Sequence, residues 1–203
     1  MGSPADVFVR LEGMSPLDPI VGLGRKVVGQ EGPAAVVSVT AHKARRWLGH
    51  PAHPAFARLS WGLLMSAAVA DWLPHTGVAV PGLTAGGLVT AVPAAVLGAG
   101  DWAELSDQGH ARAGVVHAGL NTVVLASFSA SLLARAGRRR VAGRALTLFG
   151  ASVLGVSGAI GGHIANNATR EALDEEGDLS EALNPGNGEP SDPGEMTPPL
   201  SEW

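Results

Sequence analysis

Histidine is the residue type in this chain with the greatest capacity for chemistry. The sequence contains seven histidines and no cysteine, and imidazole is a good ligand for zinc, copper, iron and haem. The absence of cysteine excludes disulfides, thiolate zinc sites and cysteine-ligated iron–sulfur clusters. Two of the histidines, His50 and His53, are three positions apart within the turn Gly49–Pro54, and a proline directly follows each of them. Their type and spacing make them candidate ligands of a transition metal.

A second pair of histidines lies in apolar sequence, where an ionisable side chain is costly and marks a functional candidate. His117 falls about one turn inside an apolar run, and His163 lies near the end of another. If these runs pack together, the two imidazoles reach similar depths, which makes them candidate ligands of a haem. Asn121 follows His117 at i+4 and therefore shares its helix face. With Asp101 and Trp102, it is predicted to form a structural polar cluster beside the histidines.

The elements that must position these residues are long apolar helices. Hydrophobic residues make up 46% of the chain, and the mean hydropathy is +0.20, which is high for a soluble enzyme. Three runs without Asp, Glu, Lys or Arg reach the ~20 residues that a membrane-crossing helix needs: 76–100, 113–134 and 145–169. A weaker apolar stretch precedes them, with Arg58 and Asp71 near its two ends.

The pattern predicts an all-α fold: a four-transmembrane-helix up-and-down bundle. Its membrane domain covers residues 49–168, and its four spans are approximately 56–73, 77–100, 113–134 and 145–166. In such a bundle the start of the first and third spans shares one membrane side with the end of the second and fourth. The candidate histidines and the predicted polar cluster all fall on that side.

Three interpretations of this gathering stay open. The residues can bind a metal or a haem. They can instead close the bundle by hydrogen bonds, with His117 and Asn121 bonded to helix ends and to Asp101. A third interpretation is passage of protons or small solutes, which needs a continuous polar route from His117 to Asp71 or His75.

The two flanks of the membrane domain differ in charge. Residues 1–169 hold 13 Lys or Arg and 8 Asp or Glu, whereas 170–203 hold one Arg and ten acids. The segment 1–48 is predicted to form amphipathic helices at the membrane interface, because basic and apolar side chains alternate at helical spacing. The acidic tail 169–203 is predicted to be mostly disordered, with a brief helical extension at its start. Nucleic-acid binding is not expected, because the arginines serve equally well as topology signals.

Four motifs occur in order along the chain: Gly49–Pro54, Asp101–Leu105, Gly114–Ala118 with Asn121, and Gly161–Ala165. Together they resemble the DUF2231 family of uncharacterised bacterial membrane proteins, over roughly residues 15–168. The resemblance implies a four-span integral membrane protein and no established activity. Some relatives carry a Rieske iron–sulfur domain after the fourth span, which points to electron transfer; without cysteine, that cluster is not carried over. Many relatives also have a third histidine where this chain has Arg58-Leu59-Ser60, so a ligand set that needs it is not carried over either.

The sequence thus leads to two functional hypotheses. The first is a non-enzymatic, multi-pass protein of the bacterial inner membrane whose histidine-lined end binds a partner or organises a membrane redox assembly. The second is a haem- or metal-binding electron-transfer component that uses His117 and His163, with His50 and His53 nearby. In both, the lipid bilayer is the main partner.

Overall fold

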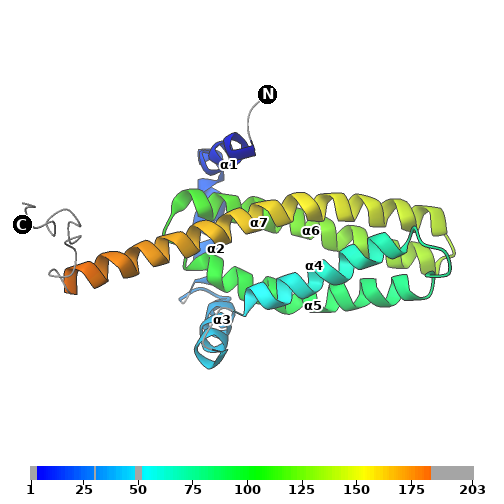
Figure 1. Cartoon of the computed structure of the whole chain (residues 1–203), viewed down its shortest axis with the longest axis horizontal. Coiled ribbons are helices and arrows are strands. Elements are labelled where there is room, and N and C mark those ends of the chain that lie inside the picture. The colour runs from blue at the N-terminus through cyan, green and yellow to red at the C-terminus, as the bar shows by residue number, and fades with distance from the viewer. Residues whose placement is uncertain (1–3, 30, 49–51, 184–203) are drawn as a thin grey trace, which may run out of the picture. The chain divides into compact units, whose positions relative to one another are not determined.

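The computed structural model describes residues 4–29, 31–48 and 52–183, and every regular element within these ranges is a helix. The predicted all-α fold is therefore confirmed for this part of the chain. The elements, in chain order, are α1 (Pro4–Glu12), the 3₁₀ turn η1 (Ser15–Leu17), α2 (Asp18–Val28), α3 (Ala35–Leu48), α4 (His53–Ala70), α5 (Ala79–Ala103), α6 (Gln108–Ala136) and α7 (Arg140–Leu183) (Figure 1).

Three of the described helices are long and apolar enough to cross a membrane. They are Ala79–Ala103, Gln108–Ala136 and the segment Arg140–Asn167 of α7. These segments coincide with the second, third and fourth predicted spans, so the prediction of long apolar helices there is confirmed. Helix α4 is 18 residues long and covers most of the first predicted span; that it crosses the membrane stays a prediction.

Helices α4 and α5 pack closely against each other, and α5 also contacts α6. The Ser60 hydroxyl on α4 donates a hydrogen bond to the Gly87 carbonyl oxygen on α5, at 2.9 Å. A Cβ atom at Gly87 would lie 2.6 Å from the Leu64 side chain. Glycine at this position therefore allows the two backbones to approach, as small residues do in membrane helix pairs.

An apolar core joins α4, α6 and α7. Its largest member is Phe128, which is fully buried, and Gly150 on α7 lies against the Phe128 ring. The buried residues of this cluster are Leu64, Ala68, Val124, Phe128, Ala151 and Leu154. Their burial gives these three helices a common packing surface, because close apolar contacts add up over many atom pairs.

The short N-terminal helices pack against the long ones. Helix α1 contacts α6, α2 contacts α5 and α6, and α3 contacts α5. Helix α2 buries Val21 but leaves Ile20 and Leu23 exposed. Its apolar side chains are therefore divided between a face that packs inside the protein and a face that does not.

Helix α7 continues beyond the predicted fourth span, as far as Leu183. The chain divides into two compact units, Met1–Ile164 and a second unit that begins at Ala165. The described start of the acidic tail is thus helical, consistent with its Ala, Leu and Glu content, since these residues favour helix. The predicted disorder of residues 184–203 lies outside the described residues.

Candidate functional site

Two histidines and one glutamate converge where α1 meets α6 and α7. Nε2 of His163 lies 2.7 Å from Oε1 of Glu12, and Nε2 of His110 lies 3.6 Å from the same oxygen. All three candidate ligand atoms fall within 4.8 Å of one another. Two imidazoles and a carboxylate form a ligand set found in zinc and non-haem iron proteins. We refer to Glu12, His110 and His163 as the Glu–His–His cluster.

The rings of this cluster are held by neighbouring side chains. The Phe8 ring on α1 stacks on the His163 ring with a centroid separation of 4.2 Å and an interplanar angle of 5°. Asp107 caps the N-terminus of α6, because its Oδ1 accepts a hydrogen bond from the His110 backbone N–H at 2.6 Å. The same Oδ1 lies 3.3 Å from Nδ1 of His110. Both imidazoles lie with Nε2 toward Glu12, and the stacked Phe8 ring supports the orientation of His163.

An arginine on α6 fixes the N-terminal helices next to this cluster. Arg112 donates two hydrogen bonds to the Asp18 carboxylate, at 2.7 and 2.9 Å, and a third to the Glu12 carbonyl oxygen, at 2.7 Å. Gln108 also donates to Asp18, at 3.1 Å. The hydrogen bonds from Arg112 and Gln108 lower the pKa of Asp18 below its ordinary value of 3.8. The backbone position of Glu12 is therefore set by charge-assisted contacts.

Trp102, predicted to belong to a polar cluster, has mainly a packing role in the structure. Its indole Nε1–H donates to the Ala111 carbonyl oxygen at 2.9 Å. Its ring lies between Gly24 on α2 and Gly114 on α6, where a Cβ atom would come within 2.6 and 2.3 Å of it respectively. The side chain thus fills a slot that two glycines leave open.

Asp101 and Asn121 have partners that differ from each other. Arg45 of α3 forms an ion pair with Asp101 at 2.9 Å, and both side chains are partly exposed. Asn121 instead belongs to a more deeply placed network with His117 and Ser157. The structure therefore does not unite Asp101, Trp102 and Asn121 in one cluster.

His117 uses both of its ring nitrogens within that network. Nδ1 lies 2.8 Å from the Ser157 carbonyl oxygen, which can only accept, and Nε2 lies 2.9 Å from Nδ2 of Asn121, which can only donate. Ser157, which is fully buried, donates from its hydroxyl to the Asn121 side-chain oxygen at 3.1 Å. These bonds select the tautomer of His117 that carries its proton on Nδ1.

The candidate haem ligands His117 and His163 have separate surroundings in the structure. His117 lies against Gly161, where a Cβ atom would be 2.7 Å from the imidazole ring. A residue two positions along an α-helix is turned by about 200°, so His163 points away from the face that His117 contacts. His163 contacts Phe8 and Glu12 instead. The arrangement favours a hydrogen-bonding role for His117 and a place in the Glu–His–His cluster for His163.

The candidate metal ligands of the first motif have different outcomes. His53 begins α4, and its Nδ1 donates to the Ala94 carbonyl oxygen at 2.7 Å while its ring lies against Gly98 of α5. His53 thus joins the start of α4 to α5. His50 lies outside the described residues, so the predicted pairing of His50 with His53 stays a prediction.

The structure bears on the predicted route for protons as well. Along α6, Asn121 is followed by Val124, then by the buried hydroxyl of Ser127, and by Phe128 before Ser131. The Ser127 hydroxyl donates to the Val123 carbonyl oxygen of its own helix at 2.7 Å. Along α7, Leu154 and Ala151 separate Ser157 from Thr147, and these apolar residues belong to the core cluster. Within the described part of the chain, the buried hydroxyls of Ser60, Thr84 and Ser127 each donate to a backbone carbonyl oxygen. The proton route stays a prediction.

Two members of the Glu–His–His cluster were not among the candidates drawn from the sequence. Glu12 lies 151 positions before His163, and no periodicity relates residues on different elements at that distance. His110 precedes the third charge-free run and resembles an ordinary loop histidine in sequence. The one local signal is Asp107, three residues before His110, since this spacing is typical of an N-cap.

Comparisons of the chain with family models, with curated proteins and with solved structures gave no match. The resemblance to the DUF2231 family thus rests on the four sequence motifs, two of which, around Trp102 and His117, lie near the polar contacts described above.

Proposed function

We propose that this chain is an integral protein of the bacterial inner membrane, similar to the DUF2231 family, with four spans in an up-and-down bundle. In this proposal α4 to α7 cross the bilayer, and the end that contains the Glu–His–His cluster binds a membrane redox partner. The observation that carries the proposal is the set of three long apolar helices. Large apolar side chains on their outer faces are exposed, for example Val89, Leu133 and Phe149, and lipid is the environment in which such faces are stable.

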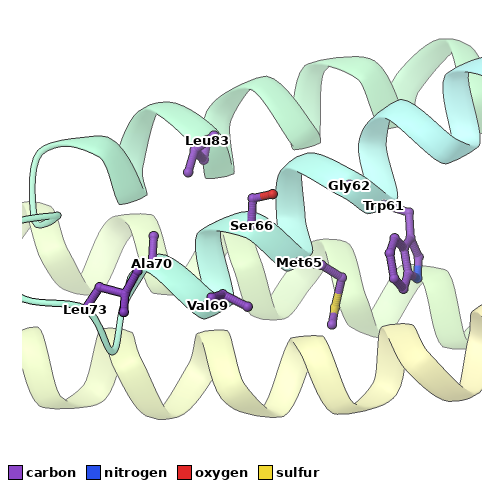
Figure 2. A pocket seen from close by; sticks show the side chains of 8 residues that line it. All are labelled: Trp61, Gly62, Met65, Ser66, Val69, Ala70, Leu73 and Leu83. Atoms are coloured by element: carbon purple, nitrogen blue, oxygen red, sulfur yellow. The ribbon is translucent and has the colours of Figure 1, made fainter.

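Several features of α4 support a fourth span. Its 18 residues extend about 27 Å, close to the ~30 Å thickness of the bilayer hydrocarbon. Its terminal charges are accommodated: Arg58 is exposed near the start, and Asp71, just after the end, forms ion pairs with Arg135 and Arg144. An apolar groove along α4, lined by residues between Trp61 and Leu73 and by Leu83 of α5, offers a surface for acyl chains (Figure 2).

The N-terminal helices support a location at the membrane interface. Trp47 at the end of α3 is 86% exposed, and indole rings are enriched at the headgroup level. Arg45 and Arg46 precede it, and cations there are attracted by anionic headgroups. With α3 at the headgroup level, exposed apolar residues on α1 and α2, such as Val9 and Leu23, also lie at the membrane–water interface.

Contacts within the Met1–Ile164 unit support the up-and-down order. His53 at the start of α4 contacts Ala94 near the end of α5. At the other end, Arg135 near the end of α6 contacts Asp71 after the end of α4. Helices α4 and α5 are therefore antiparallel, and α4 and α6 end at the same level, as alternating spans require.

Labelling of single cysteines tests the span number, because the native chain has no cysteine that would interfere. Cysteine is introduced one position at a time at Lys43 on α3, Ser106 between α5 and α6, and Ala136 at the end of α6; all three residues are exposed. Four spans predict that an impermeant maleimide labels Lys43→Cys and Ser106→Cys from one side and Ala136→Cys from the other. Labelling of Lys43→Cys from the same side as Ala136→Cys would show that α4 does not cross.

The haem alternative receives less support from the geometry than binding of a metal ion. Both nitrogens of His117 are occupied by hydrogen bonds, so a haem would have to replace two bonds that the buried network already makes. An absorption spectrum of the purified protein decides this point, because a haem gives a Soret band. We expect no Soret band.

A further inference from the structure

We infer that Glu12, His110 and His163 bind one divalent transition-metal ion of the zinc or iron(II) class, which fastens α1 to α6 and α7. The inference deepens the proposed function by naming a ligand for the histidine-lined end. It does not depend on the number of spans, because the three residues belong to the same compact unit.

The distances within the cluster are close to those of a metal site. Two ligand atoms about 2.1 Å from a tetrahedral metal lie about 3.4 Å apart. The separation of His110 Nε2 from Glu12 Oε1, 3.6 Å, already fits this value. The separation of His163 Nε2 from the same oxygen, 2.7 Å, corresponds to a hydrogen bond. Metal binding requires this contact to open by roughly 0.7 Å, a movement within reach of side-chain rotation.

The surroundings of His110 and His163 provide an independent reason to expect a metal. A metal-ligating histidine usually presents its other ring nitrogen to a carboxylate or a carbonyl group, which fixes the tautomer. When Nε2 of His110 faces Glu12, its Nδ1 faces Asp107 at 3.3 Å. The Phe8 ring, stacked on His163, keeps the second imidazole in the plane that points Nε2 into the cluster.

The ligand types select the class of ion. Calcium and magnesium prefer oxygen ligands, whereas two imidazoles and one carboxylate suit zinc, iron(II), cobalt(II) or nickel(II). The side chain of His110 is 8% exposed, and those of Glu12 and His163 are about a quarter exposed. An ion can therefore enter from one side. Three protein ligands also leave a coordination position for water or for a group from a partner.

Binding also changes the protonation of the cluster. In the metal-free arrangement His163 Nε2–H donates to the Glu12 carboxylate. A metal needs the lone pair of Nε2, so the proton on that nitrogen moves by way of solvent to Nδ1 of the same ring, which stays neutral, before the bond to the metal forms. The metal thus replaces the hydrogen bond between His163 and Glu12 with three coordinate bonds that join α1, α6 and α7.

Titration of the full-length protein with cobalt(II) tests this inference. The chain is purified in detergent with an affinity tag that lacks histidine, stripped with EDTA and titrated with Co²⁺, whose visible absorption reports coordination by imidazole. We expect saturation at one Co²⁺ per chain, displacement by Zn²⁺ at equal stoichiometry, and a higher Tm of the metal-loaded protein. Absence of stoichiometric binding by the unsubstituted chain would overturn the inference without recourse to any variant.

Variants locate the site. Glu12→Gln preserves size, and His163→Asn keeps a smaller polar side chain. Each replaces a strong ligand with a neutral amide and is expected to weaken Co²⁺ binding by more than about 100-fold. Asp107→Asn keeps a side chain that can cap α6 but removes the carboxylate that faces Nδ1 of His110. It is expected to weaken Co²⁺ binding about 10- to 100-fold at unchanged stoichiometry. The matched controls are His42→Asn and His75→Asn, two exposed histidines outside the cluster, which should bind as the unsubstituted chain does.

The outcomes separate this inference from the proposed function. Loss of binding in the cluster variants with retention in the controls supports the metal site, provided that helix content is unchanged. Equal binding by all variants shows an adventitious ion and overturns it. Cysteine labelling tests the number of spans without any metal, and the Co²⁺ titration tests the metal site without reference to the spans. Failure of one prediction is therefore distinguishable from failure of the other.

Discussion

The two ends of the long helices differ in how exposed their polar groups are. We call the end with the Glu–His–His cluster the open end, and the end with Asp71 and Arg135 the closed end. The end near the Glu–His–His cluster gathers its groups from α1, α2, α3 and the long helices, and most of these groups keep some exposure. The opposite end centres on one carboxylate, Asp71, whose side chain is 4% exposed. An open polar end can exchange its hydrogen bonds for a ligand, whereas a closed end mainly holds helices together.

At the closed end, Asp71, Arg135, Ser131 and Thr147 each contact more than one polar group. Arg135 of α6 donates to Asp71, and Arg144 of α7 lies 3.6 Å from the same carboxylate. Beside them, the hydroxyls of Ser131 and Thr147 are 2.8 Å apart, and Ser131 also donates to the Gly143 carbonyl oxygen. Both hydroxyl residues are almost fully buried. Such a network has little capacity for a ligand, because its donors and acceptors already satisfy one another.

The largest expected effect is at Asp71. Asp71→Asn leaves the Arg135 guanidinium buried without its counter-charge, and loss of one partner of a buried pair costs about 3–5 kcal/mol. We expect the free energy of unfolding, measured by SDS titration in mixed micelles, to fall by that amount.

The matched control for Asp71 is Asp101→Asn at the open end. Asp101 also pairs with an arginine, Arg45, but their side chains are 26% and 44% exposed, and exposed pairs contribute about 0–1 kcal/mol. A cost for Asp71→Asn no larger than that for Asp101→Asn would remove the distinction between a closed and an open end.

A smaller effect is expected from Gly114, which tests whether the open end is nevertheless tightly packed. In Gly114→Ala the new methyl group would lie 2.3 Å from Cδ1 of Trp102, so the indole or α6 must move, at a cost of about 1–3 kcal/mol. Gly119→Ala on the same helix meets no atom within 4 Å and should be neutral or stabilise by up to ~1 kcal/mol. Equal stabilities of the two variants, measured by thermal unfolding in detergent, would contradict the tight packing of Trp102.

The sequence predicted the helices better than it predicted their contacts. Runs without charge identify α5, α6 and the first part of α7, because the cost of a charged group in lipid or in a core excludes such groups over a whole span. After residue 169 the sequence predicts only a brief helical extension, whereas α7 runs to Leu183, because Ala, Leu and Glu favour helix.

The candidate site was predicted only in part, and the reason is physical. His117 and Asn121 lie one turn apart on one helix, so their contact follows from local geometry. The partners of His163 are on α1, and helical periodicity carries no information about which face of α7 receives a short N-terminal helix. The prediction that His117 and His163 bind a haem together rests only on their similar depth in the bundle. It takes no account of the direction of each side chain around α7, where His163 points away from the face that His117 contacts.

The smallest expected effect is a change in how stability depends on pH when Asp18 is replaced. Asp18 lies at the open end and holds the N-terminal helices to Arg112. The hydrogen bonds from Arg112 and Gln108 lower the pKa of Asp18 below 3.8. A carboxylate with a lowered pKa in the folded state contributes stability above its unfolded pKa, and this contribution is lost as the pH falls through the folded pKa. In Tm measurements between pH 6 and the acid limit of folding, Asp18→Asn should therefore lose less stability below about pH 4 than the unsubstituted chain does.

The control is Asp178→Asn, which changes an exposed aspartate outside this network and should follow the unsubstituted curve of Tm against pH. Parallel curves for all three proteins would show that the Asp18–Arg112 contact does not hold the N-terminal helices in solution.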